Sequence, residues 1–467
     1  MKKFNEYSIN ISNDLIKKYN VSGSYYTSYP VLSEWSNDFS CQDFASALKM
    51  LCTSKNNNPL FLYVHFPFCA KQCYYCICNS IITQGHHETQ KYLDYLLHEI
   101  DLLINFFEEY SFTPDFKMIH LGGGTPNLMN ENEFDTLIEK IKTFVRIEDI
   151  NEFVIEVDPR TATKEKLKYY SEKGINRLSF GIQDFNPNVQ KAINRIQSPE
   201  KVEQLLSPDI KKLFKSINFD ILYGLPLQSR ESFRKTMEIV LKINPDRITL
   251  LKYAHMPNIR KHQNFIREED MPDYVEGQRI FIETVDYLLD NGYEHVGIDH
   301  FARPHDNLAK AMKNKTLWRN FIGFTPGGIH NIIGIGPTST SSFNDFYVQN
   351  VYNLSEYYGS IDENKFPVLR GYKLNADDLI RREIINKIVC YGILNFKDIE
   401  RMFDIKFNKY FKYEISMLDD LIKDGFLLLD DESITVTSPG RIFIRHICKV
   451  FDKKYSRKEN VYRISGP

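Results

Sequence analysis

The most informative part of this chain is Tyr63-Val-His-Phe-Pro-Phe-Cys69-Ala-Lys-Gln-Cys73-Tyr-Tyr-Cys76-Ile-Cys78-Asn79, which places three cysteines at the spacing Cys-x3-Cys-x2-Cys directly after an apolar run. Only 8 of the 467 residues are cysteine, so chance does not explain this spacing. A tetrahedral zinc site more naturally uses two separated Cys or Cys/His pairs. Three thiolates can instead hold three irons of a [4Fe-4S] cluster and leave the fourth iron open.

An open iron is what a radical S-adenosylmethionine (SAM) enzyme needs. The amino and carboxylate groups of SAM chelate that iron, and an electron from the cluster then cleaves the sulfonium to a 5′-deoxyadenosyl radical. A zinc site or a structural thiol cluster is the alternative. A disulfide is not expected between thiols so close in a chain without a secretion signal. We therefore expect cluster chemistry at this loop.

The composition is that of a globular protein, with 42% hydrophobic and 26% charged residues. A net charge of −2 gives no overall field that would favour nucleic acid, so we expect no nucleic-acid partner. The first residues lack the apolar core of a signal peptide, and no apolar run is long enough to span a membrane. The scattered cysteines at 41, 52, 390 and 448 fit reduced thiols. We expect a cytoplasmic protein without a membrane partner.

Between about residues 60 and 298, short apolar strands alternate with amphipathic helices, which is typical of parallel βα units. The candidate strands are Leu60–Phe66, Phe116–Leu121, Phe153–Val157, Arg177–Gly181, Ile217–Leu222, Arg247–Leu251 and His295–Ile298. The candidate helices are Gln90–Glu109, Asn132–Phe144, Lys164–Lys173, Glu231–Lys242 and Tyr274–Asn291. This pattern predicts an α/β fold with a full or partial TIM-like barrel and its chemistry at the carboxyl ends of the strands.

We divide the chain into four parts: an N-terminal extension (1–58) that serves as a substrate or lid segment, the βα barrel (59–300), a connecting segment (301–373) and a C-terminal module (374–467). The module is mainly helical, with helical periods at Ala376–Val389, Phe396–Met402, Tyr413–Lys423 and Arg441–Phe451 and a hairpin between the last two. It resembles a winged helix. Winged helices often bind DNA, but the mixed charge of these helices favours a lid or packing role.

Glycines and acids follow the next two candidate strands. In Gly122-Gly123-Gly124-Thr125-Pro126, three glycines let the backbone approach a ligand and bind the methionyl part of SAM. A glycine-rich turn alone is weak evidence, because turns after strands often need glycine. Glu156 closes the following strand, where a carboxylate can bind a ribose diol or an ammonium group. Alone, Glu156 or the nearby Asp158 would more often cap a helix or face solvent.

Further polar residues close the later strands. Gln183 and Asp220 end the fourth and fifth, and Arg195 could offer its guanidinium to a carboxylate or form a structural ion pair instead. The segments Tyr253-Ala-His255 and Asp299-His300-Phe-Ala-Arg303 are also dense in polar groups. An isolated histidine is more often structural, but the grouping around His300 allows a role at the site.

Taken in order, these motifs resemble the bacterial oxygen-independent coproporphyrinogen III oxidases. The ordered set is the cysteine loop, Gly-Gly-Gly-Thr-Pro, Glu-Val-Asp-Pro-Arg, Gly-Ile-Gln-Asp-Phe, Asp-Ile-Leu-Tyr-Gly-Leu-Pro, Tyr-Ala-His-Met-Pro and His-Phe-Ala-Arg-Pro. The segment Gly23-Ser-Tyr-Tyr26-Thr27-Ser28-Tyr29-Pro30 is similar to the Gly-Pro-Arg-Tyr-Thr-Ser-Tyr-Pro of that family. The similarity runs from about residue 20 to the end of the chain.

The resemblance implies a radical SAM oxidoreductase of haem biosynthesis that decarboxylates two propionates of coproporphyrinogen III to vinyl groups, giving protoporphyrinogen IX. It implies a [4Fe-4S] cluster on Cys69, Cys73 and Cys76, and two SAM molecules. The residues expected to bind SAM are Tyr63, Tyr75, Gly123, Gly124, Thr125, Glu156, Gln183, Arg195, Asp220, Ala254 and Thr340, and those expected to act in catalysis are Cys78, Tyr63, Arg303 and His300. The connecting segment would lie near the second SAM and the substrate.

Several positions depart from the family pattern on the side of the substrate and the second SAM. Ile77 replaces a glycine between cysteines, Tyr25 replaces an arginine suited to substrate carboxylates, and Ile322 replaces a glutamine. Gly-Ile-His330-Asn331 replaces a Gly-Asp-Thr-Asp-like stretch, and Thr340 replaces an apolar residue. A paralogue that methylates another tetrapyrrole or degrades haem anaerobically, or a non-catalytic haem- or cluster-binding protein, is therefore the alternative. We expect a monomer that takes electrons from a donor such as a flavodoxin or ferredoxin.

Overall fold

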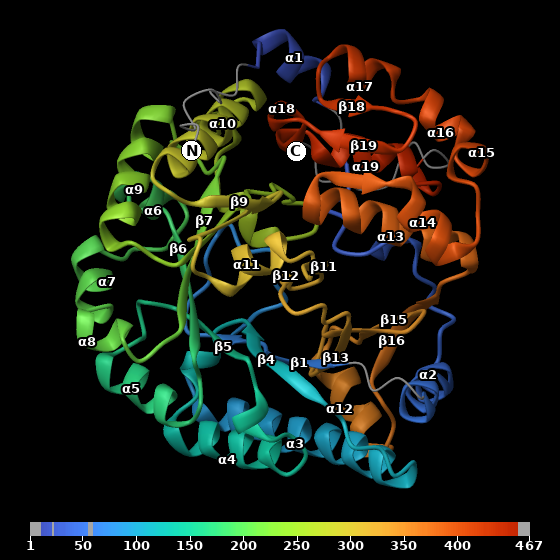
Figure 1. Cartoon of the computed structure of the whole chain (residues 1–467). Helices are drawn as coiled ribbons and strands as arrows, with labels where there is room; N and C mark the ends of the chain where they lie inside the picture. Colours follow the sequence, from blue (N-terminus) through green and yellow to red (C-terminus); the bar gives the residue numbers. More distant parts are fainter. Residues whose placement is uncertain (1–10, 21–22, 55–58, 456–467) are drawn as a thin grey trace.

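The computed structural model describes residues 11–20, 23–54 and 59–455. Its centre is a sheet of 12 strands in the order β16-β15-β14-β13-β1-β4-β5-β6-β7-β8-β10-β9, and helices cover the outer face (Figure 1). The central strands run parallel: β1 (Leu60–Phe66), β4 (Phe116–Gly123), β5 (Glu152–Val157), β6 (Arg177–Gln183), β7 (Ser216–Tyr223), β8 (Arg247–Lys252) and β13 (Asn331–Ile335). Among the described residues the two end strands do not pair, so the TIM-like barrel is partial and the predicted fold class is confirmed.

Residue spacing explains the elements that carry the site. β1 lies between β4 and β13, and Leu60, Phe61 and Leu62 are fully buried, as expected for a strand covered on both faces. The helix after it, α3 (His86–Glu109), buries Leu93, Leu96 and positions three or four residues further along, which together form one apolar face against the sheet. The apolar residues whose spacing predicted β1 and α3 are therefore the ones that these elements bury.

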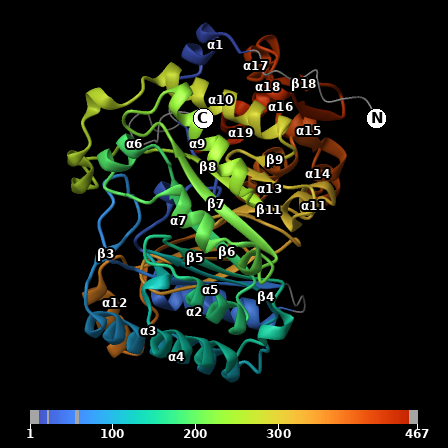
Figure 2. The ribbon, with the colours of Figure 1, turned by 90° about the vertical axis from the view of Figure 1, so that its left-hand side faces the viewer.

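The outer helices follow the strands around the barrel. They are α4 (Glu131–Lys142), α5 (Lys164–Glu172), α6 (Pro187–Ala192), α7 (Pro199–Leu205), α8 (Pro208–Lys211), α9 (Arg230–Ile243) and α10 (Tyr274–Asp290). Figure 2 shows α5, α7 and α9 along the outer face of the strands. None of the described helices has both the length and the hydropathy to cross a membrane.

The sheet does not end where we expected the barrel to end. β9 (Glu294–Gly297) and β10 (His300–Ala302) form one antiparallel edge, and α11 (Asn307–Lys313) and the hairpin of β11 (Trp318–Asn320) and β12 (Gly323–Thr325) follow. The chain then returns to the sheet as β13, β14 (Thr340–Phe343), β15 (Phe346–Asn350) and β16 (Val368–Lys373), with α12 (Leu354–Asp362) before the last. The segment 301–373 thus contributes strands to the barrel sheet as well as connecting two parts. The division into domains stays a prediction.

The C-terminal module lies beside the open side of the barrel (Figure 1). Its elements are α13 (Ala376–Tyr391), β17 (Ile393–Asn395), α14 (Phe396–Phe403), α15 (Phe407–Tyr410), α16 (Lys412–Ser416), α17 (Asp419–Lys423), β18 (Leu427–Leu429), β19 (Ser433–Val436), α18 (Ser438–Ile442) and α19 (Ile444–Phe451). The helices that we expected at 413–423 and 441–451 are each broken into two. At Phe443 the break has φ −107° and ψ 20°, outside the helical range.

The N-terminal extension bridges the module and the sheet. It carries α1 (Asn13–Lys18) and α2 (Cys41–Thr53), and Ser36 pairs with Gly371 of β16. The ring of Tyr19 lies 4.8 Å from that of Phe426 in the module. Because this extension crosses the open side of the barrel, its residues 23–30 lie next to the interior.

Candidate active site

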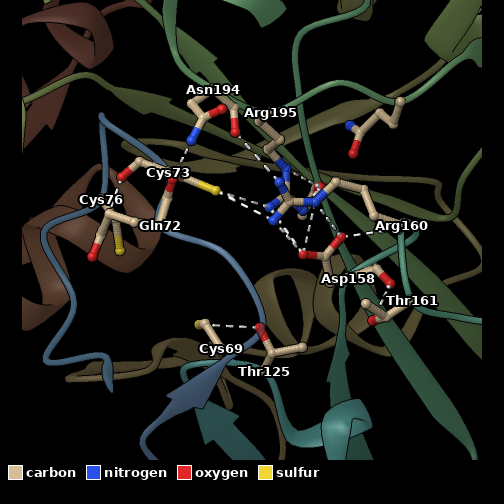
Figure 3. A network of polar contacts seen from close by, with 12 residues as sticks. Cys69, Gln72, Cys73, Cys76, Thr125, Asp158, Arg160, Thr161, Asn194 and Arg195 are labelled. Carbon is tan, nitrogen blue, oxygen red and sulfur yellow. Dashed lines mark hydrogen bonds and ion pairs between the residues drawn. The ribbon is translucent and has the colours of Figure 1, made fainter. Parts of the chain in front are cut away.

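The cysteine loop leaves the carboxyl end of β1 and is held at both ends. A short parallel pair, β2 (Phe68–Cys69) and β3 (Ile81–Ile82), closes it, with the Thr83 amide donating to the Cys69 carbonyl at 3.1 Å. The Tyr74 amide donates to the carbonyl of Ile193 at 3.0 Å, which ties the loop to the segment after α6. The backbone therefore fixes Cys69, Cys73 and Cys76 around one space (Figure 3).

The three thiols of the loop could hold either a single zinc ion or a [4Fe-4S] cluster. Among the described residues, no three His, Cys, Asp or Glu side chains converge on a point that would hold a single metal ion, as zinc requires. A cubic cluster takes its thiolates at separated corners. Burial raises the pKa of Cys69 to about 12, whereas a hydrogen bond with Cys78 lowers that of Cys76 to about 6. The spread-out thiols fit a cluster.

Two arginines reach the sulfur of Cys73. Nη2 of Arg160 lies 3.4 Å and Nη1 of Arg195 lies 3.5 Å from that sulfur, and the carboxylate of Asp158 pairs with both (Figure 3). Burial acts against the charge of Asp158, but the two guanidinium groups hold its pKa below the usual range. The result is a buried cationic network on one of the three cysteines expected to hold the cluster, and N–H groups that donate to a thiolate stabilise its negative charge.

The glycine-rich turn and Glu156 meet on the same face. Nε2 of His120 lies 2.9 Å from Oε1 of Glu156, and the amide of Gly123, at φ +120°, donates to Oε2 at 3.2 Å. A Cβ atom on Gly122 would lie 2.7 Å from Oε1 of Glu156, so a side chain there would displace the carboxylate from this position. The acid is therefore oriented in advance and remains partly exposed, with 36% of its side chain accessible.

Tyr63 and His65 point to the same side of β1 and contact each other. The hydroxyl of Tyr63 lies 3.1 Å from Nδ1 of His65, and Nε2 of His65 lies 3.4 Å from the hydroxyl of Thr338. Burial lowers the pKa of His65 to about 4, so this ring is neutral near pH 7. It can therefore orient Tyr63 by hydrogen bonding without adding charge.

The later strand ends supply a second polar group. Asp220 accepts from Nδ2 of Asn218 at 2.8 Å and from the hydroxyl of Ser179 at 3.2 Å, and burial raises its pKa. Gln183 has φ +67° at the end of β6. Arg195 donates to the carbonyl of Gly181 as well as to Asp158 and Cys73. Its guanidinium is thus already engaged, which limits how it could meet a further carboxylate.

A buried amide ties the cysteine loop to the end of β8. Nε2 of Gln263 donates to the carbonyls of Tyr75 and Ala254, both at 3.1 Å. Gln263 is fully buried. Gln263, which the sequence did not single out, thereby links Tyr75 and Ala254, two residues that we expected to lie near SAM.

The structure separates His300 from Arg303. His300 lies at the start of β10, with Nδ1 2.6 Å from Asp299, and pairs with Thr249. Arg303 follows Ala302, which pairs with Arg247 at the opposite end of β8, and it donates to the carbonyl of Asn291 at 2.6 Å. Arg303 is therefore not brought to the site, because the short antiparallel β10 carries the chain away from it.

The residues that differ from the family pattern lie mostly around β13 and β14. Ile322 packs against the same buried cluster as Tyr63, Thr340 opens β14, and His330 stacks on Trp318 with 4.0 Å between ring centroids. Ile77, beside Cys78, is instead 46% exposed on the cysteine loop. Cys78 stays close to its neighbour, since its thiol hydrogen-bonds with that of Cys76.

A cavity of about 250 Å³, partly open to solvent, lies between the N-terminal extension, β11, the strands β13 and β14, and α13. Its lining includes Tyr26, Ser28, Asn331, Arg319 and Arg382. It does not contain the cysteines. The cavity reaches β13 at Asn331, which pairs with Leu60 at the start of β1, whereas the cysteine loop follows the other end of β1, so the two regions are separate.

Comparisons with known proteins agree with the geometry. Residues 63–240 match the model of the radical SAM superfamily. The chain is 39% identical over 451 residues to oxygen-independent coproporphyrinogen III oxidase of Escherichia coli (strain K12), covering 97% of each, and 37% identical over 455 residues to the protein of that name from Synechocystis sp., again covering 97% of each. The solved structure of coproporphyrinogen III oxidase from Escherichia coli, described as a radical SAM enzyme, matches with a TM-score of 0.88 and 38% identity, over 96% of this chain and 100% of that one.

Proposed function

This chain belongs to the family of the oxygen-independent coproporphyrinogen III oxidases, and from that membership we infer that it converts coproporphyrinogen III to protoporphyrinogen IX without oxygen. It is a radical SAM oxidoreductase of haem biosynthesis. Each of two propionates loses a β-hydrogen atom, CO2 and one electron and becomes a vinyl group. The observation that carries this conclusion is the placement of the cysteine loop, the glycine-rich turn and Glu156 at one end of the barrel.

The cofactors are a [4Fe-4S] cluster and two molecules of SAM, and together they supply the one-electron chemistry that removes the hydrogen. We assign Cys69, Cys73 and Cys76 to the cluster. Glu156, Gly123 and Tyr63 would bind one SAM. The residues placed around the SAM molecules, mainly the second, are Tyr75, Gly124, Thr125, Gln183, Arg195, Asp220, Ala254 and Thr340. Cys78 and His300 keep a proposed role in catalysis, whereas Arg303 does not.

The protein contributes orientation and exclusion of water rather than bond-making groups. Glu156, held by His120, is placed to accept a hydrogen bond from an ammonium or ribose hydroxyl group of SAM. His65 holds the phenol of Tyr63 beside it. Such preset hydrogen bonds lower the entropy that binding must overcome.

The tetrapyrrole is proposed to occupy the cavity beneath the N-terminal extension. Tyr26, Thr27, Ser28 and Arg382 line it. The hydroxyls of Tyr26 and Ser28 already donate to Asp452 and to the carbonyl of Pro30, so Thr27 and the guanidinium of Arg382 are the groups that suit a ligand with carboxylates. The Nε of Arg382 is buried and lacks a hydrogen-bond partner among the described residues. The proposal is supported by the position of this cavity beside β13 and β14, the strands that carry Asn331 and Thr340.

We propose that electrons arrive from a small donor protein such as a flavodoxin or ferredoxin at the cysteine loop. Support comes from apolar side chains at its rim: Ile77 is 46% exposed, and Phe265, 68% exposed, stacks on Tyr74. We also propose that the chain acts as a monomer in the cytoplasm, where the reducing conditions that a low-potential cluster needs are met.

Product analysis tests the function. The anaerobically reconstituted protein is incubated with SAM, a reductant and coproporphyrinogen III, and the porphyrinogens are identified by mass spectrometry. We expect protoporphyrinogen IX with two carboxyl groups lost. Cleavage of SAM with all four propionates intact would identify a paralogue with another substrate, and no SAM cleavage in protein with a full cluster would indicate a binding protein.

A further inference from the structure

Arg445 of α19 is a buried cation without a counter-ion. The residue is 2% exposed, and its guanidinium forms no ion pair with a carboxylate in the part of the chain that the structure describes; its polar neighbour there is the side chain of Tyr25. Buried charges in proteins are normally paired, because an unpaired charge removed from water is strongly unfavourable. A buried arginine without a carboxylate partner among the described residues is suited to receive an anion.

The guanidinium lies on the wall of a narrow cavity between the barrel and the C-terminal module. Its central carbon is 4.4 Å from the ring centroid of Tyr25, which lines the same cavity. Lys252, at the end of β8, also lines it, and its ammonium lies 4.7 Å from the ring of Tyr274. Within the described residues this ammonium has no hydrogen bond or ion pair. Two cations without counter-ions therefore share one space.

The other polar groups of the cavity do not neutralise them. The carboxylate of Asp299 already pairs with Arg319 at 3.1 Å and with His300 at 2.6 Å. Arg441 adds a third positive charge and donates to the carbonyl of His295 at 2.9 Å. Burial raises the pKa of Tyr25, so its phenol is neutral near pH 7. The cavity thus carries an excess of positive charge that an incoming anion would balance.

The narrow cavity adjoins the one proposed for the tetrapyrrole. Tyr25 lines the narrow cavity, and its chain neighbour Tyr26 lines the larger one. Arg319, on the larger cavity, donates to the carbonyl oxygen of Tyr25 as well as to Asp299. The narrow cavity has a volume of about 10 Å³, room for about one water molecule, so a carboxylate arm enters it only as the lining side chains move apart.

We propose that Arg445 and Lys252, with Tyr25, form a binding site for one propionate carboxylate of the substrate, an assignment that rests on the proposed function. A guanidinium presents parallel N–H donors that match a carboxylate, and the ammonium adds a second charge. The rings of Tyr25 and Tyr223 would cover the methylene groups of the arm. The site gives the C-terminal module a role in substrate recognition and supplies a cation beside the position where Tyr25 replaces an arginine.

The test measures binding of coproporphyrin III, the air-stable fluorescent form of the ligand, to protein carrying its cluster and SAM. Arg445→Met is expected to weaken binding about 10- to 150-fold, the effect of a lost charge-assisted hydrogen bond, and Lys252→Met by less. The tetramethyl ester of coproporphyrin III, which has no carboxylates, should bind the parent and both variants equally. Arg234→Met is the matched control, because Arg234 stacks on Tyr287 at 3.2 Å on the outer helices, and it should bind like the parent.

Thermal unfolding separates this role from a structural one. Without porphyrin, Arg445→Met should unfold at a temperature equal to or above that of the parent, since an unpaired buried charge is removed. A clear loss of stability together with parent-like porphyrin binding would show that Arg445 serves packing alone and would overturn the proposal.

Two further outcomes distinguish other failures. If acetate stabilises the parent through Arg445 while the variants keep their porphyrin affinity, the site binds a free anion and the propionate assignment is wrong. If the parent binds coproporphyrin III but forms no protoporphyrinogen IX, the proposed function fails while the binding site stands.

Discussion

Nη2 of Arg160 lies 3.4 Å from the sulfur of Cys73, although the two residues are 87 positions apart in the chain. Asp158 holds the guanidinium in place through a contact of 2.7 Å, and Arg195 approaches the same sulfur from another side. Donors to a cluster ligand stabilise the reduced, more negative cluster and so raise its reduction potential. With a cluster on Cys73, this network would raise the potential at which the cluster accepts an electron.

Replacing Arg160 should lower the reduction potential of the cluster. One N–H···S bond worth about 1 kcal/mol corresponds to a shift on the order of 40 mV for one electron. We expect Arg160→Gln to show this decrease in a redox titration followed by electron paramagnetic resonance. Arg160→Lys, which keeps the charge and loses the planar guanidinium, separates the two contributions. An unchanged potential in Arg160→Gln would mean that the contact has no electronic effect.

Removing His120 should weaken SAM binding without loss of iron. Its ring orients Glu156 at 2.9 Å and does not contact the cysteines. His120→Ala is expected to weaken SAM binding about fivefold, the size of a neutral hydrogen bond, and Glu156→Ala by about 10- to 150-fold. Equilibrium binding of SAM measures both, and iron analysis provides the control. Parent-like SAM affinity in Glu156→Ala would contradict the assignment of this acid.

Cluster content should depend on three thiols only. Replacing Cys69, Cys73 or Cys76 by alanine should abolish the broad cluster absorbance after anaerobic reconstitution, because each holds one iron. Cys41→Ala is the matched control, as Cys41 lies at the start of α2 and far from the loop in the fold. Iron and sulfide analysis should give about four of each per parent chain. Stoichiometric zinc in anaerobically purified protein would contradict the cluster assignment.

A buried acid predicts how stability changes with pH. Glu99 of α3 accepts from the hydroxyl of Tyr357 at 2.6 Å and the amide of Gly336 at 2.7 Å, and burial raises its pKa to about 7 from the ordinary value of 4.5. Between these values the folded protein binds more protons than the unfolded one. The free energy of unfolding should therefore fall as pH rises from about 4.5 to 7, by at most about 3 kcal/mol.

The contribution of Glu99 is isolated by comparison with Glu99→Gln, which cannot titrate. Denaturant unfolding of the parent and this variant between pH 5 and 8 measures the difference in slope. The free energy of unfolding of the parent should fall relative to that of Glu99→Gln as pH rises toward 7. A constant difference would show that the Glu99 carboxyl group does not ionise in this range.

The sequence predicted the parallel strands and outer helices well, because periodic burial produces their pattern directly. β1 was expected at Leu60–Phe66 and has these bounds. The strands β13 to β16 were missed, because they lie in the segment that we took as a connection, and β14 to β16 carry many polar residues and pair only after the chain returns to β1. The break at Phe443 was missed as well, because hydrophobic periodicity continues across it.

Parts of the site that are contiguous in the chain could be recognised, and parts that are assembled by folding could not. The cysteine spacing and the three glycines carry their chemistry within a few residues. The contacts of Arg160 with Cys73, and of Gln263 with Tyr75 over 188 positions, exist only in three dimensions. His65 could have been found, since it alternates with Tyr63 on one face of β1. We expected Arg303 at the site, but the short antiparallel strand β10 leads the chain from His300 to the amino end of β8, away from the site.

The central claim is that this protein removes hydrogen from the propionates of coproporphyrinogen III by radical SAM chemistry. The most direct measurement uses substrate carrying deuterium at the β-carbons of its propionates, under strictly anaerobic conditions with SAM and reductant. Mass spectrometry should find deuterium in 5′-deoxyadenosine and two vinyl groups in the tetrapyrrole product. Unlabelled 5′-deoxyadenosine together with four intact propionates would contradict the account.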